Sequence, residues 1–131
     1  MSLAVDLGGI QASGFPLDEH IPLTIRARLQ QLAPAMRVQN IGDGVAPPKG
    51  TPDPDLLAWI EAHDCLLVTN NRATMPVHLP AHLASGRHVP GIVVVPRRIK
   101  VGAIVKDLLL LWGAKRPGEF HDRVVYLPLR R

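Results

Sequence analysis

The sequence predicts one α/β domain built around a short, mainly parallel sheet of four or five strands. Three observations lead to this fold class. The chain has 131 residues, a typical length for one domain with one core. Its composition, 47% apolar and 20% charged, is that of an ordinary globular protein. Short apolar segments suited to strands alternate with segments of helical periodicity, which favours an α/β sandwich with right-handed crossovers.

The first three elements form a β-α-β unit. Phe15–Leu17 is a brief apolar segment and predicts a strand that ends at Asp18. Pro22 suits the first turn of a helix, which we expect over 23–32. That helix has one apolar stripe, consisting of Leu23, Ile25, Leu29 and Leu32. Apolar and polar residues alternate over 36–41, as in a half-buried strand.

A loop rich in glycine and proline, 42–52, separates this unit from a second helix. Asp53 is a good N-cap, Pro54 a good first helical residue, and Asp55 favourable to the helix dipole. We expect this helix to extend to about His63.

The next elements continue the alternation. Cys65–Val68 is a continuous apolar run typical of a fully buried strand. A helix is expected within 76–85, started or broken at Pro80 and stopped by Gly86. Gly91–Pro96 is rich in β-branched residues and gives the clearest strand.

The last helix and strand are expected at 101–112, with Gly113 as C-cap, and at 123–127. Residues 1–14 show little periodicity and are interpreted as a leader, either loose or a short edge element. The organised domain is therefore placed at 15–131.

Several classes of protein are disfavoured. No apolar stretch approaches the roughly 20 residues that cross a bilayer. The N-terminal segment lacks the basic and apolar blocks of a signal peptide, so a cytoplasmic protein is expected. The single cysteine, Cys65, excludes an internal disulfide framework and is interpreted as a buried strand thiol. The net charge of +4 is compatible with a polyanionic partner such as RNA.

The predicted topology gathers polar residues at one edge of the sheet. In a parallel sheet every strand-to-helix loop emerges at the same edge, and ligands usually bind there where the strand order switches. That edge would hold Asp18, the 53–55 helix start and the segment 69–71. Carboxylates so placed could hold divalent cations for phosphodiester hydrolysis. Helix capping explains Asp53 better than catalysis does, and for Asp55 the two explanations are balanced.

The histidines offer no clear site. His78 and His82 stand four residues apart, but Pro80 lies between them and no acidic partner follows, so exposed helix positions are expected. Four further histidines are isolated in the sequence and receive no role: His20, His63, His88 and His121.

Five segments together carry a resemblance to a known family: Leu17–Pro22, Asp53–Leu57, Leu67–Pro76, Pro90–Val94 and Tyr126–Pro128. In order and spacing the chain from Phe15 to Leu129 resembles the PIN-like proteins of the DUF5615 group. The resemblance implies a PIN-like three-layer α/β/α sandwich. It also implies a metal-dependent ribonuclease, the toxin of a bacterial toxin-antitoxin pair, with RNA and an antitoxin protein as partners.

The acidic positions of the family pattern fall on Asp18 and on Asp53 and Asp55. The shared edge and the resemblance together lead us to expect the following roles. Asp18 would be the principal ligand of Mg or Mn, and Asp55 a second ligand or the holder of a metal-bound water. Asn71 would orient substrate or water. The substrate-binding residues would be Thr69, Asn70 and Arg72.

An alternative is a degenerate PIN-like module that binds a partner protein or RNA without cleavage. The family pattern leads us to expect Thr-x-Asp where this chain has Thr69-Asn70-Asn71. An amide oxygen can coordinate a metal, but it adds no negative charge and cannot act as a general base. The very apolar segment 104–112 could also serve a partner surface. A homodimer is expected, because symmetric pairs are the commonest assembly.

Overall fold

The structure, a computed structural model, describes residues 14–44, 46–98, 100–114 and 118–129. Within these ranges five strands form one all-parallel sheet in the order β2-β1-β3-β4-β5. The strands are β1 (Phe15–Leu17), β2 (Val38–Asn40), β3 (Leu67–Thr69), β4 (Ile92–Val94) and β5 (Val124–Tyr126). The helices are α2 (Leu23–Leu32), α3 (Asp53–His63), α4 (Met75–Ala84) and α5 (Val101–Ala114). The predicted α/β class with a mainly parallel sheet is confirmed.

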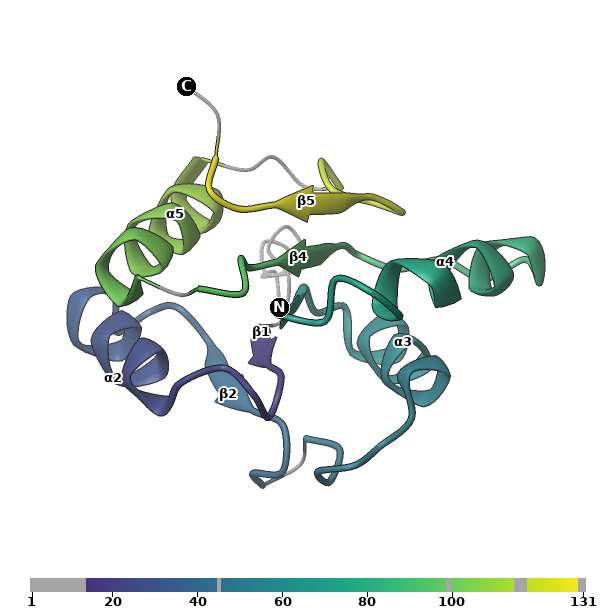
Figure 1. The fold of residues 1–131 in the computed structure, drawn as a ribbon, viewed down its shortest axis with the longest axis horizontal. Helices are drawn as coiled ribbons and strands as arrows, with labels where there is room; N and C mark the ends of the chain where they lie inside the picture. Colours follow the sequence, from purple (N-terminus) through teal and green to yellow (C-terminus); the bar gives the residue numbers. More distant parts are fainter. Residues whose placement is uncertain (1–13, 45, 99, 115–117, 130–131) are drawn as a thin grey trace, which may run out of the picture.

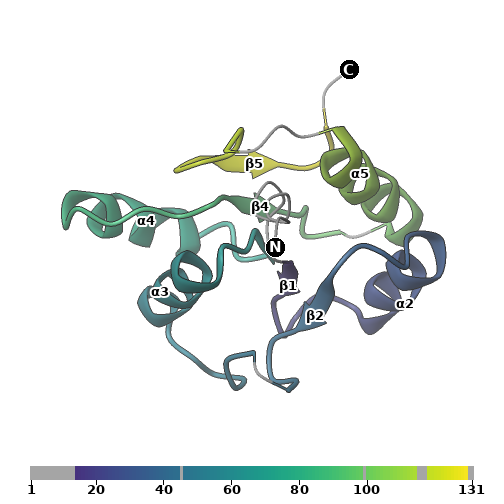
Figure 2. The ribbon, with the colours of Figure 1, turned by 180° about the vertical axis from the view of Figure 1, so that it is seen from behind.

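Two helices cover each face of the sheet, so the domain has three layers. Figures 1 and 2 show α2 and α5 on one side and α3 and α4 on the other. Strand residues alternate between the two cores because successive side chains of a strand point to opposite faces. Val68 and Val93 pack toward α2 and α5, whereas Leu67, Ile92 and Val94 pack toward α3 and α4.

The strand order reverses at the centre of the sheet. The chain leaves β1 for the outer strand β2, then returns across β1 to β3 and continues outward to β5. Loops that follow β1 and β3 therefore diverge to opposite faces, which opens a crevice at the carboxyl ends of these two strands. Asp18 directly follows β1, and Thr69 is the last residue of β3.

The apolar stripe predicted for α2 is wrong at two of its four positions. Ile25 and Leu29 are fully buried, but Leu23 is 71% exposed and Leu32 is 54% exposed. Leu23 lies about 160° around the helix from Ile25, at about 100° per residue, and so points away from the sheet. Leu32 ends the helix and borders a groove beside α5.

Two residues expected at helix breaks lie inside helices. Pro80 is internal to α4, and Gly113 belongs to α5, which ends at Ala114. Helix stability in a folded domain comes mainly from packing of the apolar face. In α4 that face is held by Met75, Leu79 and His82, all of which are buried.

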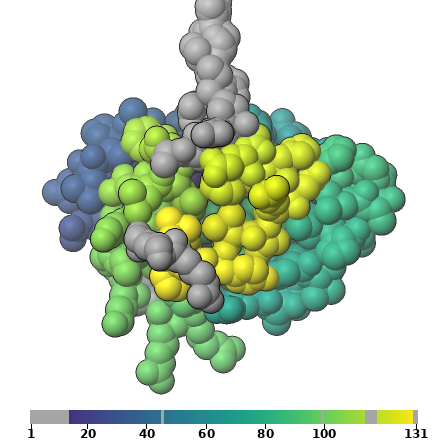
Figure 3. All heavy atoms as spheres, turned by 90° about the horizontal axis from the view of Figure 1, so that it is seen from above, coloured from purple at the N-terminus to yellow at the C-terminus, as the bar shows by residue number. Residues whose placement is uncertain are grey.

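Edge strand β5 closes one side of the sheet. The space-filling view in Figure 3 shows the chain around β5 at the surface, between α5 and the α3–α4 layer. Residues 1–13 of the predicted leader lie outside the described residues, and Gly14 forms a parallel bridge with Cys65. No helix in the described part of the chain is long and apolar enough to span a membrane.

Candidate functional site

Asp18 and Thr69 meet where the strand order reverses. The Thr69 hydroxyl donates a 2.7 Å hydrogen bond to Asp18 Oδ2, between residues 51 positions apart in the sequence. Thr69 has no exposed surface, and its Oγ1 also accepts a 3.0 Å hydrogen bond from the Asn71 backbone N–H. The carboxylate of Asp18 is therefore held in one orientation by a buried hydroxyl.

The loop after β1 provides a second carboxylate beside Asp18. Asp18 Oδ1 accepts a 2.6 Å hydrogen bond from the Glu19 backbone N–H. Glu19 Oε1 in turn accepts a 2.7 Å hydrogen bond from the Gly50 N–H in the loop that leads to α3. The Glu19 side chain thus joins the first loop to the second.

Asp53 brings the start of α3 to the same place. The prediction of a side-chain cap at Asp53 is wrong, because Pro52 occupies the N-cap position and no side chain caps the helix. Asp53 Oδ2 instead accepts hydrogen bonds from the Thr74 hydroxyl (2.9 Å) and from Asn71 Nδ2 (3.3 Å). The carboxylate faces the loop that follows β3.

Asn71 makes a hydrogen bond through each end of its amide. Its Oδ1 accepts a 3.0 Å hydrogen bond from the Thr74 backbone N–H, while its Nδ2 donates to Asp53 Oδ2 and to the Thr74 hydroxyl. The amide meets both needs of this pattern, because the Asp53 carboxylate needs a donor and the Thr74 N–H needs an acceptor. Asn71 therefore joins the β3–α4 loop to the start of α3.

Asp18 and Asp53 line one open cleft of about 380 Å³. The other lining residues are Glu19, His20, Thr51, Leu56, Asn70 and Asn71. Asp55, which we predicted as a ligand, is exposed and does not line this cleft. The structure thus brings Asp18, Asn70 and Asn71 together as expected, with Asp53 in the position expected for Asp55.

Two of the predicted substrate-binding residues, Thr69 and Arg72, do not line the cleft. Thr69 is fully buried beneath Asp18 and holds that carboxylate in place. Arg72 is exposed and places its guanidinium 5.5 Å from the ring centroid of Tyr126, at the end of β5. Arg72 and Tyr126 therefore form a separate cationic and aromatic pair at the same edge of the sheet.

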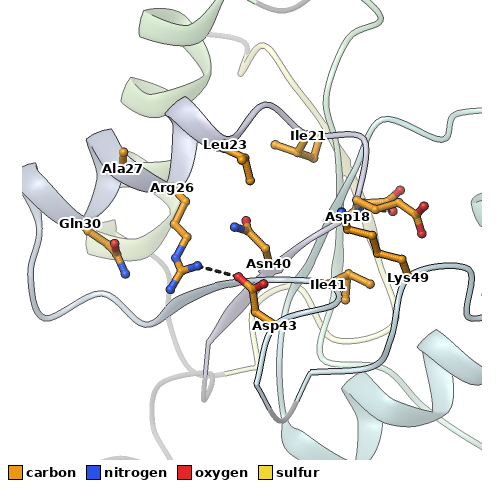
Figure 4. A pocket seen from close by; sticks show the side chains of 11 residues that line it. Asp18, Ile21, Leu23, Arg26, Ala27, Gln30, Asn40, Ile41, Asp43 and Lys49 are labelled. Carbon is orange, nitrogen blue, oxygen red and sulfur yellow. Dashed lines mark hydrogen bonds and ion pairs between the residues drawn. The ribbon is translucent and has the colours of Figure 1, made fainter.

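A second hollow, of about 430 Å³, shares Asp18 and Glu19 with the cleft. Figure 4 shows Asp18 and Lys49 on one side of this hollow, and Arg26 with Asp43 on the other. Arg26 Nη1 pairs with Asp43 Oδ2 at 2.8 Å. Lys49 thus lies on the Asp18 side of the hollow and Arg26 on the opposite side, so a polyanion that entered the hollow would meet both cationic side chains.

The donor set of the cleft suits hard divalent cations. Carboxylate and amide oxygens are the ligands that Mg²⁺ and Mn²⁺ prefer, whereas the described residues that line the cleft include no cysteine and one histidine, His20. Asp18 and Asp53 each retain acceptor capacity, because a carboxylate offers about four lone-pair sites. The residues present therefore fit a Mg²⁺ or Mn²⁺ ion.

The sequence signals for several site residues were weak. Asp53 was explained by helix capping, and Thr74 and Lys49 do not belong to any motif that we recognised in the sequence. The one usable signal was position, because each of these residues lies in a loop or helix start at the carboxyl edge of the sheet. His82 was expected at the surface but is buried, with its Nε2 3.0 Å from Glu61 Oε1.

Comparison of the chain with models of protein families, with curated proteins and with solved structures finds no match.

Proposed function

We propose that this protein is a metal-dependent ribonuclease of PIN-like type, with Mg²⁺ or Mn²⁺ bound in the cleft between Asp18 and Asp53. The observation that carries the proposal is the convergence of these two carboxylates on one cleft at the point where the strand order reverses. The sequence resemblance to the DUF5615 group supports the same activity.

The residues in and beside the cleft would have different roles in metal binding and catalysis. Asp18 and Asp53 would hold the ion, which when bound supplies charge stabilisation to the phosphate and lowers the pKa of the attacking water. Thr69 orients Asp18, and Asn71 orients Asp53. Glu19 lines the cleft and is available to accept a proton from water.

RNA binding would use the positive side chains around the cleft. Lys49 and Arg26 lie in the adjoining hollow and offer charge to backbone phosphates. The Arg72–Tyr126 pair offers an exposed aromatic ring, 47% accessible for the whole residue, on which a base could stack. Single-stranded nucleic acids use both kinds of contact, and the resemblance to the DUF5615 group favours RNA among them.

The resemblance to the DUF5615 group also supports a proposal about partners and cellular location. A toxin of this type acts in the cytoplasm, is neutralised by an antitoxin protein, and is proposed here to form a homodimer. Light scattering of the purified protein tests the last point, and a monomer at high protein concentration would contradict it.

A cleavage assay with matched variants tests the proposed activity. Single-stranded RNA is incubated with the protein and Mn²⁺, and products are separated on a denaturing gel. Asp18→Asn and Asp53→Asn should each lose about 100-fold or more in rate, since each removes a charge that stabilises the transition state. The control Asp55→Asn lies at the same helix start but outside the cleft and should keep nearly full activity. Equal rates for Asp18→Asn and the parent protein would remove Asp18 from the mechanism.

A second candidate function, a degenerate PIN-like module that binds a partner protein or RNA without cleavage, is favoured by the groove between α2 and α5. This groove has a volume of about 320 Å³ and is mostly apolar, with Leu32 and Leu110 exposed by 54% and 41%. Calorimetric titration with Mn²⁺ separates the two functions. Binding tighter than about millimolar, the weak end of natural oxygen-ligand sites, would count against a degenerate module.

A further inference from the structure

A cluster of two histidines and one aspartate lies at the other end of the sheet. His88 stands in the connection from α4 to β4, and His121 and Asp122 stand just before β5. These connections enter the strands at their amino ends, whereas the Asp18 cleft lies at their carboxyl ends. The cluster is therefore separate from the proposed nuclease site.

The three side chains converge on one atom. Asp122 Oδ2 lies 2.8 Å from His88 Nδ1 and 3.3 Å from His121 Nε2. The two imidazole rings stack with their centroids 5.1 Å apart and their planes 28° apart. Nitrogen atoms from two segments 33 residues apart thus face one carboxylate oxygen.

The backbone holds the carboxylate in this position. Asp122 Oδ1 accepts a 2.9 Å hydrogen bond from the Val89 N–H, and the Asp122 N–H donates a 2.9 Å hydrogen bond to the Val89 carbonyl. Asp122 has a φ of 61°, which only a few per cent of non-glycine residues adopt. The backbone N–H of His88 donates a 3.2 Å hydrogen bond to Glu61 Oε2. Of these bonds, the one from the Val89 N–H is of the kind that orients a ligating carboxylate for metal binding.

The spacing fits a tetrahedral site. One ligand atom from each residue lies within 4.8 Å of the other two. At Zn–N and Zn–O distances of 2.0–2.2 Å, tetrahedral ligand atoms stand about 3.4 Å apart, so small side-chain rotations would bring the three into place. The side chains of His88 and His121 are 59% and 55% exposed, which leaves room for rotation and for water as a fourth ligand.

We propose that His88, His121 and Asp122 form a surface site for Zn²⁺ or a similar transition-metal dication, with water completing the coordination. Two imidazoles and one carboxylate suit Zn²⁺, and they are a poor set for Mg²⁺, which prefers oxygen. The ion joins the connection before β4 to the connection before β5. It thereby fastens the edge strand β5 to the rest of the sheet. This inference does not depend on the nuclease proposal.

Calorimetric titration of the full chain with Zn²⁺ tests the site. With excess Mg²⁺ present to occupy the Asp18 cleft, one Zn²⁺ should bind per chain. His121→Ala should weaken the Zn²⁺ affinity more than tenfold, since loss of even an outer-shell partner costs 10–100-fold. Asp122→Asn should do the same, and asparagine tolerates the left-handed backbone at that position. Circular dichroism confirms that each variant is folded.

Two controls make the outcome specific. His63→Ala removes another exposed histidine, which stacks on Trp59 and does not belong to the cluster, and should leave Zn²⁺ affinity unchanged. Asp18→Asn should also leave it unchanged, because Asp18 belongs to the other edge of the sheet. If His121→Ala binds Zn²⁺ as tightly as His63→Ala, or if the parent protein binds none, the site is refuted.

Discussion

The Thr69 hydroxyl lies 2.7 Å from Asp18 Oδ2, so the end of β3 holds the carboxylate that follows β1. Neighbouring parallel strands bring their ends together, and here the strand order also reverses between them. A buried hydroxyl at this point cannot turn to solvent for a hydrogen bond. The pair is therefore a fixed part of the cleft.

Replacing Thr69 tests this relationship. Thr69→Val keeps the shape of the side chain but removes the donor to Asp18 and the acceptor for the Asn71 N–H. We expect a loss of about 1–3 kcal/mol in the free energy of unfolding, typical of buried groups left unpaired. Mn²⁺ affinity and RNA cleavage should fall with it, whereas Thr69→Ser should retain both. Chemical denaturation and Mn²⁺ titration measure the two effects.

Asn71→Asp distinguishes a structural amide from a lost metal ligand. Asn71 Nδ2 donates to Asp53 Oδ2, so a carboxylate at position 71 would face the carboxylate of Asp53. Like charges at this distance should lower the melting temperature in the presence of a chelator. With Mn²⁺ the added charge should raise metal affinity and restore the melting temperature. A variant that is equally stable with and without Mn²⁺ would argue against a cation in the cleft.

Cys65 should be unreactive in the folded protein. The residue is 1% exposed, and burial, with a contribution from Asp64, raises the pKa of its thiol to about 11. Since only the thiolate is nucleophilic, alkylation by iodoacetamide at pH 8 should be slow in buffer and fast in denaturant. The thiol of the unfolded chain ionises at about pH 8.5. Burial of the neutral thiol therefore contributes to stability below that pH, and this contribution is lost as the pH rises toward 11. Mass spectrometry of alkylated protein follows the reaction.

Glu61 links α3 to the end of α4 and to the chain that follows it. Its carboxylate accepts hydrogen bonds from the His88 N–H and from Arg87 Nε, and lies beside His82. The His88 hydrogen bond is the largest cause that lowers the pKa of Glu61 from 4.5. Its contribution to stability is therefore present above about pH 4.5 and is lost as the pH falls through the lower folded-state pKa.

Glu61→Gln should therefore unfold at lower urea concentration than the parent at pH 7, and the difference should shrink at pH 3. Asp55→Asn, which changes an exposed carboxylate at the other end of the same helix, provides the comparison and should show a smaller difference at pH 7. A Glu61→Gln difference that stays constant between pH 7 and pH 3 would contradict the role of its charge.

Periodicity and turn residues in the sequence determined the fold class and the order of its elements. The helix at Leu23–Leu32 and the strand at Phe15–Leu17 have the predicted bounds. The parallel topology that follows from this alternation also predicted that Asp18 and the residues after β3 would share one edge. These features depend on local spacing and on rules that hold for any α/β sheet.

Tertiary structure alone decided which acidic residue joins Asp18 in the cleft and which histidines meet. Asp53 and Asp55 are neighbours at one helix start, but successive helix positions point in different directions, and only Asp53 lines the cleft. His88 and His121 are far apart in the sequence, so nothing in the sequence indicated that they meet. They meet because the connections that carry them enter the adjacent strands β4 and β5. Such pairings depend on register and side-chain direction across the sheet, and these are fixed only when the layers pack.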